Sequence, residues 1–526
     1  MPRRMLSLVA AAVLAATGTI ASGQPAGATG HLDNPGFEAD GATQSPTGWS
    51  ESSGTGHRGA SFVEPGGHGG DFRLTHWADM DYTVTTSRTL FGLRNGTYTL
   101  AAWVRSDGDQ TAAHIGLRDC GRTEQRTELP RTGGSDWVRI VVSTKVTTKR
   151  CTIVLHSEGT PGDWAHFDDI EFARGAPDPL TVRGGDVSTL KKNEDFGAVY
   201  YDRDGDRDDA LSILRGHGMN WARLKVWVNP TDGYNTKAHV LEMARRIKAL
   251  RMGLVIDFHY SDTWADPGKQ FKPRAWEALS FPDLQQAVYD HTYDVLRSLW
   301  RQGTPAHIAQ IGNEINGGML WPDGRWDNWD GLAALLTSAS TAVSDASPRT
   351  EVMLHLAEGG NNGGHVWWFD NATSRGVPFD VIGVSHYTFW HGTYGALQAN
   401  IADLSARYDK DVIVMETAWG FTLAENDSTE NIFNASLRQA VGYPASPAGQ
   451  AKALRDMFTV LAGVPGNRVR GAFYWEPTWT AVEGAGWDPD DPTSGDGWEN
   501  QAVFDYEGRA LPAIEEFAGP QRRNRH

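Results

Sequence analysis

The sequence predicts a parallel (β/α)8 barrel that is preceded by an antiparallel β-sandwich. The 526-residue chain is too long for one ordinary domain. Short alternating runs fill residues 31–173 without a long helical pattern, whereas apolar runs alternate with helical segments after residue 181. The stretch RGAPDPL (174–180) is typical of a linker. We therefore expect a sandwich over 31–173, a barrel over 181–518 and a short tail over 519–526.

The sandwich is predicted from strand-like runs that Gly-, Pro- and Asp-rich turns separate. Alternating apolar and polar residues over such lengths are typical of antiparallel sheets, in a jelly-roll or related arrangement. The clearest runs are TYTLAAWVRS (97–106), DWVRIVVSTKV (136–146), CTIVLHS (151–157) and HFDDIEFA (166–173).

The barrel is predicted from eight apolar runs that end in polar residues, with helical periodicity between them. An open doubly wound sheet is the alternative, but it would call for a Gly-rich dinucleotide loop, which the sequence lacks. The expected strands lie in 180–188, 219–228, 252–260, 307–314, 351–358, 379–387, 411–419 and 470–477. The clearest helices are 238–251, 283–303 and 448–463.

The first 28 residues have the pattern of a secretory signal peptide. Arg3 and Arg4 form a positive region, an apolar stretch follows, and Ala-Gly-Ala stands at 26–28. The apolar stretch is too short and too rich in Ala and Gly for a membrane anchor. We expect a secreted, extracellular protein with no membrane association after cleavage.

Charge and composition narrow the class of partner. The formal net charge of −17 would repel nucleic acid and anionic membranes, so neutral ligands fit better. The 21 Trp residues offer flat apolar faces that suit sugar rings, although core packing accounts for a share of them. The two cysteines, Cys120 and Cys151, are expected to pair in an oxidising compartment.

Functional side chains of this barrel type are expected where the strands end. No His/Cys cluster has the spacing of a zinc site, and no G-x-S-x-G motif supplies a serine nucleophile. The polar and aromatic strand-end residues are Asp186, Trp227, Asn229, Asp257, His259, Asn313, Glu314, His355, His386, Tyr387, Glu416, Trp475 and Glu476.

Two of these residues form a candidate catalytic pair. Glu314 ends the fourth strand and Glu416 ends the seventh, across the barrel mouth. Carboxyl groups about 5–5.5 Å apart can act on a glycosidic bond as nucleophile and acid. A neighbouring negative charge helps to raise the pKa of the acid. Each Glu taken alone could instead be a capping or solvated carboxylate.

Motifs along residues 181–513 resemble those of the endo-β-1,4-galactanases of glycoside hydrolase family 53. The two most specific are HYSDTWADP and GNEINGGMLWP. The others are RGGDVS (183–188), GMNWARLKVWVNP (218–230), VMETAWG (414–420), GAFYWEPTW (471–479) and ENQAVFDYEGRALP (499–512).

The resemblance implies a role for each matching residue. Glu314 would be the general acid/base and Glu416 the nucleophile. Asn313 would hydrogen-bond the sugar 2-hydroxyl, and Arg223 would keep Glu416 ionised, unless Arg223 is only a salt bridge of the barrel floor. Further substrate contacts would come from Asp186, His259, Trp264, Trp321, His386, Tyr387, Trp390 and Trp475. The family usually has Tyr at the position of His386 and Pro at the position of Thr388. This departure could alter one subsite wall.

Bacterial members of the family share a calcium site between the loops after strands seven and eight. Oxygen-bearing side chains alternate along the first of these loops here, and the later loop adds two carboxylates. The implied calcium ligands are Glu425, Asp427, Asn431, Asp496 and Glu499. A solvated acidic loop is the alternative. No cofactor is expected for the chemistry itself.

Residues 31–173 resemble carbohydrate-binding jelly rolls, with NPGFE at 34–38 and FDDIEF at 167–172. A galactan-binding module is expected. The candidate binders are Trp49, Trp77, Trp103 and Trp164, of which Trp103 fits a core position best. Glu38 and Asp168 could hold a structural calcium ion.

These observations together lead us to expect a monomeric, retaining endo-β-1,4-galactanase acting on pectin side chains. The neutral polysaccharide β-1,4-galactan would be its partner. Two alternatives stay open: an endo-β-glycanase of the same clan on mannan or xylan, and a carbohydrate-binding protein without catalysis.

Overall fold

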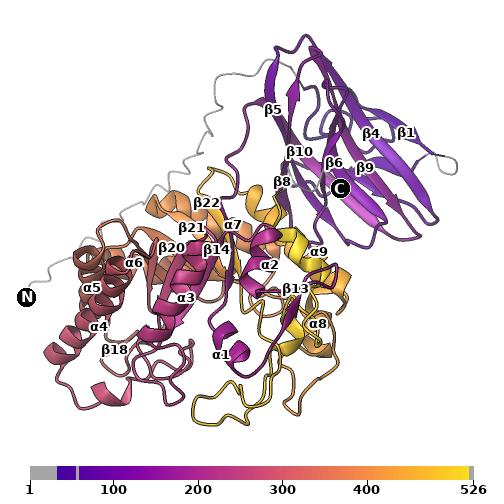
Figure 1. Ribbon diagram of the computed structural model, residues 1–526. Coiled ribbons are helices and arrows are strands. Elements are labelled where there is room, and N and C mark those ends of the chain that lie inside the picture. The colour runs from indigo at the N-terminus through magenta and orange to yellow at the C-terminus, as the bar shows by residue number, and fades with distance from the viewer. Residues whose placement is uncertain (1–31, 55–58, 135, 520–526) are drawn as a thin grey trace, which may run out of the picture.

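The computed structural model describes residues 32–54, 59–134 and 136–519. The signal peptide predicted over 1–28 lies outside these residues, as does all but the first residue of the predicted tail. Figure 1 shows an N-terminal β-sandwich beside a larger barrel. Strand β10 ends at Arg174 and the first barrel strand begins at Val182.

The sandwich consists of two five-stranded antiparallel sheets, in the orders β1-β4-β9-β6-β7 and β2-β3-β10-β5-β8. Leu100, Val104, Ile153 and Phe167 pack between the sheets. The antiparallel sandwich predicted from the sequence is confirmed. Its strands are β1 Ser50–Ser53, β2 Ser61–Pro65, β3 Phe72–Trp77, β4 Tyr82–Phe91, β5 Gly96–Ser106, β6 Ala112–Arg118, β7 Gln125–Glu128, β8 Val138–Val146, β9 Arg150–Gly159 and β10 Trp164–Arg174.

A disulfide links the end of β6 to the start of β9. Cys120 and Cys151 are bonded, with their Cα atoms 4.3 Å apart. The predicted pairing is therefore confirmed, and the bond lies wholly within the sandwich.

The tryptophans of the sandwich divide between core and surface differently from the prediction. Trp49 is buried against Phe37. Trp103, assigned to the core from sequence, is only half-buried and stacks on His68. Its neighbours Ala102 and Val104 face the core instead, because alternation along a strand places Trp103 on the opposite face.

The barrel is a closed ring of eight parallel strands in the order β11-β14-β15-β16-β19-β20-β21-β22. The first and last strands pair, with Gly184 opposite Phe473, so the open-sheet alternative is excluded. The barrel strands are β11 Val182–Asp186, β14 Trp221–Val226, β15 Gly253–Phe258, β16 Ile308–Ile311, β19 Glu351–Leu356, β20 Val381–Ser385, β21 Asp411–Glu416 and β22 Val469–Tyr474.

Helices surround the barrel, and apolar side chains fill its interior. Val255, Ile308, Met353, Ile413 and Phe473 form a buried cluster inside the ring. The helices are α1 Leu190–Asp195, α2 Ala210–Gly216, α3 Lys237–Ala249, α4 Phe281–Arg301, α5 Trp329–Ala346, α6 Asn362–Ser374, α7 Tyr394–Tyr408, α8 Ala435–Val441 and α9 Pro447–Ala462. Two short antiparallel pairs lie in the loops: β12 Tyr200–Tyr201 with β13 Arg207–Asp208, and β17 Gly318–Met319 with β18 Gly324–Arg325.

The sandwich packs on the barrel through β8 and helices α7 and α9. The backbone N–H of Arg139 donates to Gln398, and Gln398 donates back to the Arg139 carbonyl. The backbone N–H of Arg131 donates to Asp456 on α9. Across the described ranges, no helix combines the length and the apolar character needed to span a bilayer.

Candidate active site

A cavity of about 1000 Å³ opens at the end of the barrel where the parallel strands terminate. Its lining combines carboxylates, aromatic rings and a few cationic groups. The lining residues that later paragraphs use are Asp186, Arg223, Lys225, Asp257, His259, Trp264, Asn313, Glu314, Glu358, Asn361, Tyr387, Trp390, Glu416, Trp475, Trp479, Trp487 and Trp498.

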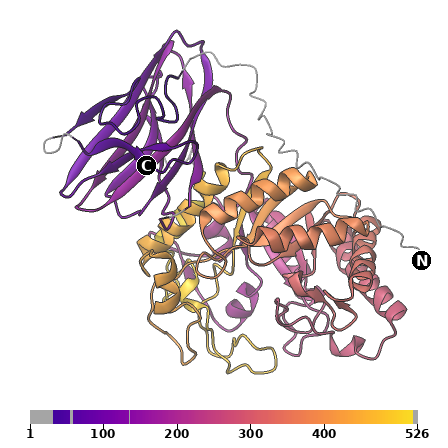
Figure 2. The same cartoon turned by 180° about the vertical axis from the view of Figure 1, so that it is seen from behind.

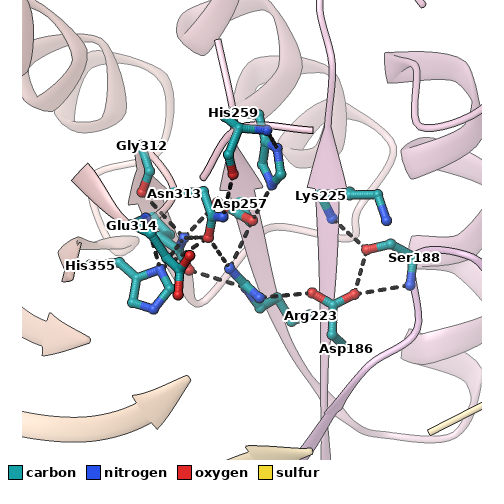
Figure 3. Close-up of polar contacts among 12 residues, drawn as sticks. Asp186, Ser188, Arg223, Lys225, Asp257, His259, Gly312, Asn313, Glu314 and His355 are labelled. Carbon is teal, nitrogen blue, oxygen red and sulfur yellow. Dashed lines mark hydrogen bonds and ion pairs between the residues drawn. The ribbon is translucent and has the colours of Figure 1, made fainter. Parts of the chain in front are cut away.

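A turn of unusual backbone geometry follows β16 and orients two of these side chains. Gly312 has φ +99°, and Glu314 has φ +49° in the left-handed region. A non-glycine residue rarely adopts this region, and such strain is concentrated at functional sites. The turn places the side chains of Asn313 and Glu314 at the cavity wall (Figure 3).

Glu314 and Glu416 meet across the cavity. One carboxylate oxygen of each lies within 4.8 Å of the other and of a ring nitrogen of His355. Burial, and then the charge of Glu416, raise the pKa of Glu314 well above its usual range. Burial also raises the pKa of Glu416, while Arg223 acts in the opposite direction. Because Glu416 alone pairs directly with Arg223, it ionises before Glu314.

Arg223 is the centre of the polar network beneath the cavity. Its Nη1 donates to Glu416 at 2.8 Å and to Asp186 at 3.0 Å. Its Nη2 donates to Asp257 and to Asn313, both at 2.8 Å. Burial alone would lower the pKa of Arg223, but the surrounding carboxylates outweigh it and raise that pKa. Figure 3 shows Arg223 between the Asp186 group and the Asn313–Glu314 group.

Neutral partners hold Asn313 and Glu314 in place from the side of β19 and β20. His355 Nδ1 lies 3.1 Å from Asn313 Oδ1, and its Nε2 lies 2.9 Å from the Ser385 hydroxyl. Ser385 in turn hydrogen-bonds the Glu314 carboxyl group. Burial lowers the pKa of His355 well below its usual range, so the ring is neutral. Asn313 also donates to the Ala265 carbonyl, which sets the direction of its amide.

Three further predicted residues lie at the cavity. Asp186 accepts hydrogen bonds from the backbone and hydroxyl of Ser188. His259 pairs through Nε2 with Asp257 at 2.9 Å. The Tyr387 hydroxyl donates to Glu416 at 3.0 Å, so Glu416 is held by one cation and one phenol.

Tryptophans form the upper walls of the cavity. Trp264 and Trp475 are half-buried with ring centres 5.7 Å apart, and Trp390 is exposed at the rim. The Lys225 ammonium lies 3.6 Å from the centre of the Trp264 ring and 3.1 Å from the Glu476 carboxylate. Trp264 also stacks on Trp479. The structure therefore brings these three predicted aromatics to one cavity.

Two predicted contacts are not at the cavity. His386 is fully buried behind the rim, where its ring lies near those of His391 and Tyr394, so the prediction that it contacts substrate is wrong. Ser385 faces the barrel interior, where it bonds His355, so alternation along the strand directs His386 outward to Tyr394 of α7. Trp321 packs edge-on against Phe271 and donates to the Gly317 carbonyl, outside the residues that line the cavity.

Sequence reasoning missed several residues that the cavity uses. Gln310 and Lys225 are polar residues inside apolar strands, and that exception to the pattern could have identified them. Asp257 is the last residue but one of β15 and belongs to the predicted strand-end residues, but no sequence pattern predicts its ion pair with Arg223. Trp479, Trp487 and Trp498 belong to the long segment after β22, where no periodicity predicts position.

The predicted calcium loops contain buried oxygens without partners. In the part of the chain that the structure describes, Asn431 Oδ1, Asp496 Oδ2 and Glu499 Oε2 accept no hydrogen bond. Burial raises the pKa of Asp496 well above its usual range, and Glu499 and Asp427 add to this. Glu425, also predicted as a ligand, is exposed. These buried oxygens fit a hard cation.

The barrel is similar in sequence and structure to known glycoside hydrolases. Residues 182–517 match the sequence profile of Glycosyl hydrolase family 53. An arabinogalactan endo-beta-1,4-galactanase of Thermothelomyces thermophilus is 34% identical over 346 residues, covering 64% of this chain and 99% of the relative. An endo-beta-1,4-galactanase of Bacillus subtilis is 32% identical, covering 64% of this chain and 85% of the relative. The solved family 53 catalytic domain of Ignisphaera aggregans superposes with a TM-score of 0.62 at 40% identity, covering 65% of this chain and 98% of that domain.

Proposed function

Because the chain belongs to glycosyl hydrolase family 53, we propose that this glycosidase is a secreted, endo-acting β-1,4-galactanase. Its substrate would be the galactan and arabinogalactan side chains of pectin, cleaved with retention of configuration. The names of the relatives described above support the linkage. The observation that carries the mechanism is the approach of Glu314 and Glu416 to within 4.8 Å. Retaining enzymes place these groups about 5–5.5 Å apart, and inverting enzymes about 6.5–9.5 Å apart.

In the first step, the Glu416 carboxylate attacks the anomeric carbon while Glu314 gives its proton to the glycosidic oxygen. The bond from the anomeric carbon to that oxygen breaks, and a glycosyl ester forms on Glu416. In the second step, Glu314 takes a proton from water, which attacks the anomeric carbon and releases Glu416. The raised pKa of Glu314 supports its role as acid, and the Arg223 contact supports Glu416 as the nucleophile.

The other cavity residues are assigned to binding. Asn313, whose amide oxygen is engaged by Arg223, would use its remaining N–H for the sugar 2-hydroxyl. Trp475 and Trp390 would stack on sugar rings, and Asp186 and His259 would complete the polar wall. This combination of aromatic faces and hydrogen-bonding groups suits a neutral polysaccharide.

A calcium ion between the loops after β21 and β22 is part of the proposal. Asp427, Asn431, Asp496 and Glu499 would hold it, and the unpartnered oxygens of the last three support this set. Calcium would then tie the loop after β21 to the loop after β22, which bears Trp487 and Trp498 of the cavity wall. Its part would be structural, with no role in bond cleavage.

The sandwich is proposed to bind galactan as a second site. The exposed face of its sheet β2-β3-β10-β5-β8 has Trp103 stacked on His68 at 3.9 Å and Trp164 stacked on His166 at 4.5 Å. Arg105 lies over Trp137 at 4.8 Å on the same face. Aromatic rings beside hydrogen-bonding groups are what a sugar-binding surface requires. A tethered second site would raise the effective concentration of substrate at the cavity.

Galactan affinity chromatography tests the sandwich proposal with the full chain carrying Glu416→Gln. We expect the column to retard this protein, and Trp164→Ala in the same background to weaken the retardation. Equal retardation of the two proteins would contradict binding by this face.

Export is proposed from the signal-peptide pattern of residues 1–28, and a monomer is expected in solution. The direct test of the enzyme proposal is reducing-end release from linear β-1,4-galactan by the wild type beside Glu416→Gln. We expect release by the wild type alone. Release from mannan or xylan instead would favour the other endo-glycanases of the clan. No release from any of the three by the wild type would favour a binding protein without catalysis.

A further inference from the structure

Two tryptophans stand exposed together on the outer side of the barrel, beyond the cavity. Trp326 follows β18 and Trp367 lies on α6, and each exposes 46% of its surface. Their ring centres are 6.4 Å apart with the planes inclined at 66°. Trp329 is buried beneath them, 5.7 Å from Trp367. A paired, exposed aromatic surface on a soluble protein marks a place where a ligand or partner binds.

This surface is fixed to the segment that carries the proposed acid. Trp368, next to Trp367, donates from its indole nitrogen to the carbonyl of Ile315, the residue after Glu314. The backbone N–H of Trp326 donates to the Gly317 carbonyl. The two strands of the β17–β18 hairpin lie close together at Gly318. A side chain would not fit there, because its Cβ would lie 2.1 Å from the Gly324 carbonyl oxygen. The two rings are therefore preorganised relative to Glu314.

Helix α6 and the loop before it connect the cavity rim to this surface. Glu358 and Asn361 line the cavity, and Asn361 caps the first turn of α6 by accepting from Gly364. Trp367 lies five positions after Asn362, the first residue of α6, so the axial distance is about 8 Å at the helical rise per residue. Asn316 and Ala357 exchange two hydrogen bonds between the loops that separate cavity from surface. A long chain that leaves the cavity on the Glu314 side would pass over these loops to reach the two rings.

A groove of about 610 Å³ lies along α5 and includes Asp330, the residue after Trp329. Arg375 and Asp330 line its near end, and the Arg375 guanidinium also lies 5.7 Å from the Trp329 ring. Small and hydroxyl-bearing side chains such as Thr337 and Ser338 line the rest. Arg375 and Asp330 pair with each other at 3.0 Å, so the charges of the groove offset one another. An uncharged, hydroxyl-rich ligand suits this lining better than an ion does.

We propose that Trp326, Trp367 and the α5 groove form a distal binding site for the galactan chain whose scissile bond lies in the cavity. This proposal rests on the proposed function, and it adds a site that lies apart from both the cavity and the sandwich. In both Figure 1 and Figure 2, α5 and α6 lie on the side of the barrel that is away from the sandwich. The site would hold one end of a long chain, and a short oligosaccharide would not reach it.

The test compares Trp326→Ala, Trp367→Ala and their double variant with the wild type on two substrates. One substrate is long linear β-1,4-galactan, and the other is a galacto-oligosaccharide that fills only the cavity. Loss of one stacking face is expected to lower kcat/KM on the polymer about five- to tenfold, given the apolar area that would stay hydrated. The rate on the oligosaccharide is expected to be unchanged. Trp300→Ala is the matched control, because Trp300 is 48% exposed at the far end of α4.

Several results would overturn the distal site. Equal losses on both substrates would mean that the rings only support the fold, and unchanged rates on the polymer would mean that they do not touch substrate. A wild type that dimerises through this surface, with monomeric variants in sedimentation, would assign it to a second copy of the chain. A wild type inactive on both substrates would refute the proposed function instead, which separates the two failures.

Discussion

Replacing Arg223 with Met should change both the pH dependence and the stability of the enzyme. The substitution removes the only cation that the structure shows bonded to Glu416, and it leaves Asp186 and Asp257 without their ion pair in the interior. The Arg223 charge lowers the pKa of Glu416, so the pKa of Glu416 should rise when that charge is removed. The acidic limb of the kcat/KM profile should therefore shift to higher pH. Removing one partner of a buried ion pair costs about 3–5 kcal/mol of unfolding free energy.

The loss of unfolding free energy in Arg223→Met should grow as the pH rises. Arg223 lowers the pKa values of Glu416 and Asp257, so without it these folded-state pKa values rise. Their protonated forms then favour folding at low pH, and this contribution disappears as the pH rises through those values. The destabilisation should therefore be larger at pH 8 than at pH 5. Chemical unfolding at the two pH values and kcat/KM on galactan would measure both effects. Arg470→Met is the matched control, because Arg470 pairs with Glu351 and Asp411 away from the cavity. An unshifted acidic limb in Arg223→Met, or an equal shift in the control, would refute the reasoning.

Three further predictions concern separate parts of the molecule. Glu314→Gln should abolish the alkaline limb of the pH profile, because activity requires the protonated form of a group whose pKa is raised; an alkaline limb that persists would assign the acid elsewhere. Cys151→Ser should lower the unfolding free energy of the sandwich by about 3–4 kcal/mol for a loop of this size, with turnover of a short oligosaccharide unchanged. Chelation of calcium should lower the melting temperature of the wild type more at pH 8 than at pH 5, because the ion-free Asp496 is stable only when protonated. Asp496→Asn should lose this response to chelator, and an Asn variant as sensitive as the wild type would exclude Asp496 as a ligand.

The barrel could be predicted from the sequence because each of its strands is a compact apolar run with a polar end. The run at 411–419 contains β21 Asp411–Glu416, and the nucleophile candidate is its last residue. The rule that function lies at strand ends then located Glu314, Glu416 and Asp186 without knowledge of their contacts. Arg223 lies inside β14, and only the resemblance to the family indicated its role. The sandwich was harder, because strands as short as β1 and β7 show too little alternation to be recognised.

Sequence reasoning failed where a residue's position depends on the direction of its side chain or on the packing of distant segments. Alternation says that Trp103 and Val104 face opposite ways, but both are apolar and either could have faced the core. His386 is a polar residue of the kind expected at the rim, yet it follows the inward-facing Ser385, so its side chain points outward to α7. The Trp326–Trp367 surface joins segments separated by forty residues, so only the packing of α6 against the loop after β16 brings the two rings together.

The anomeric form of the first product tests the central claim most directly. Glu314 and Glu416 approach closely enough for double displacement, so the sugar released from β-1,4-galactan should have the β configuration at its new reducing end. Proton NMR during the first minutes of hydrolysis, before mutarotation, would record it. We expect the β-anomer signal to appear first and the α-anomer signal to grow later. An α-anomer that forms first would contradict a nucleophilic Glu416.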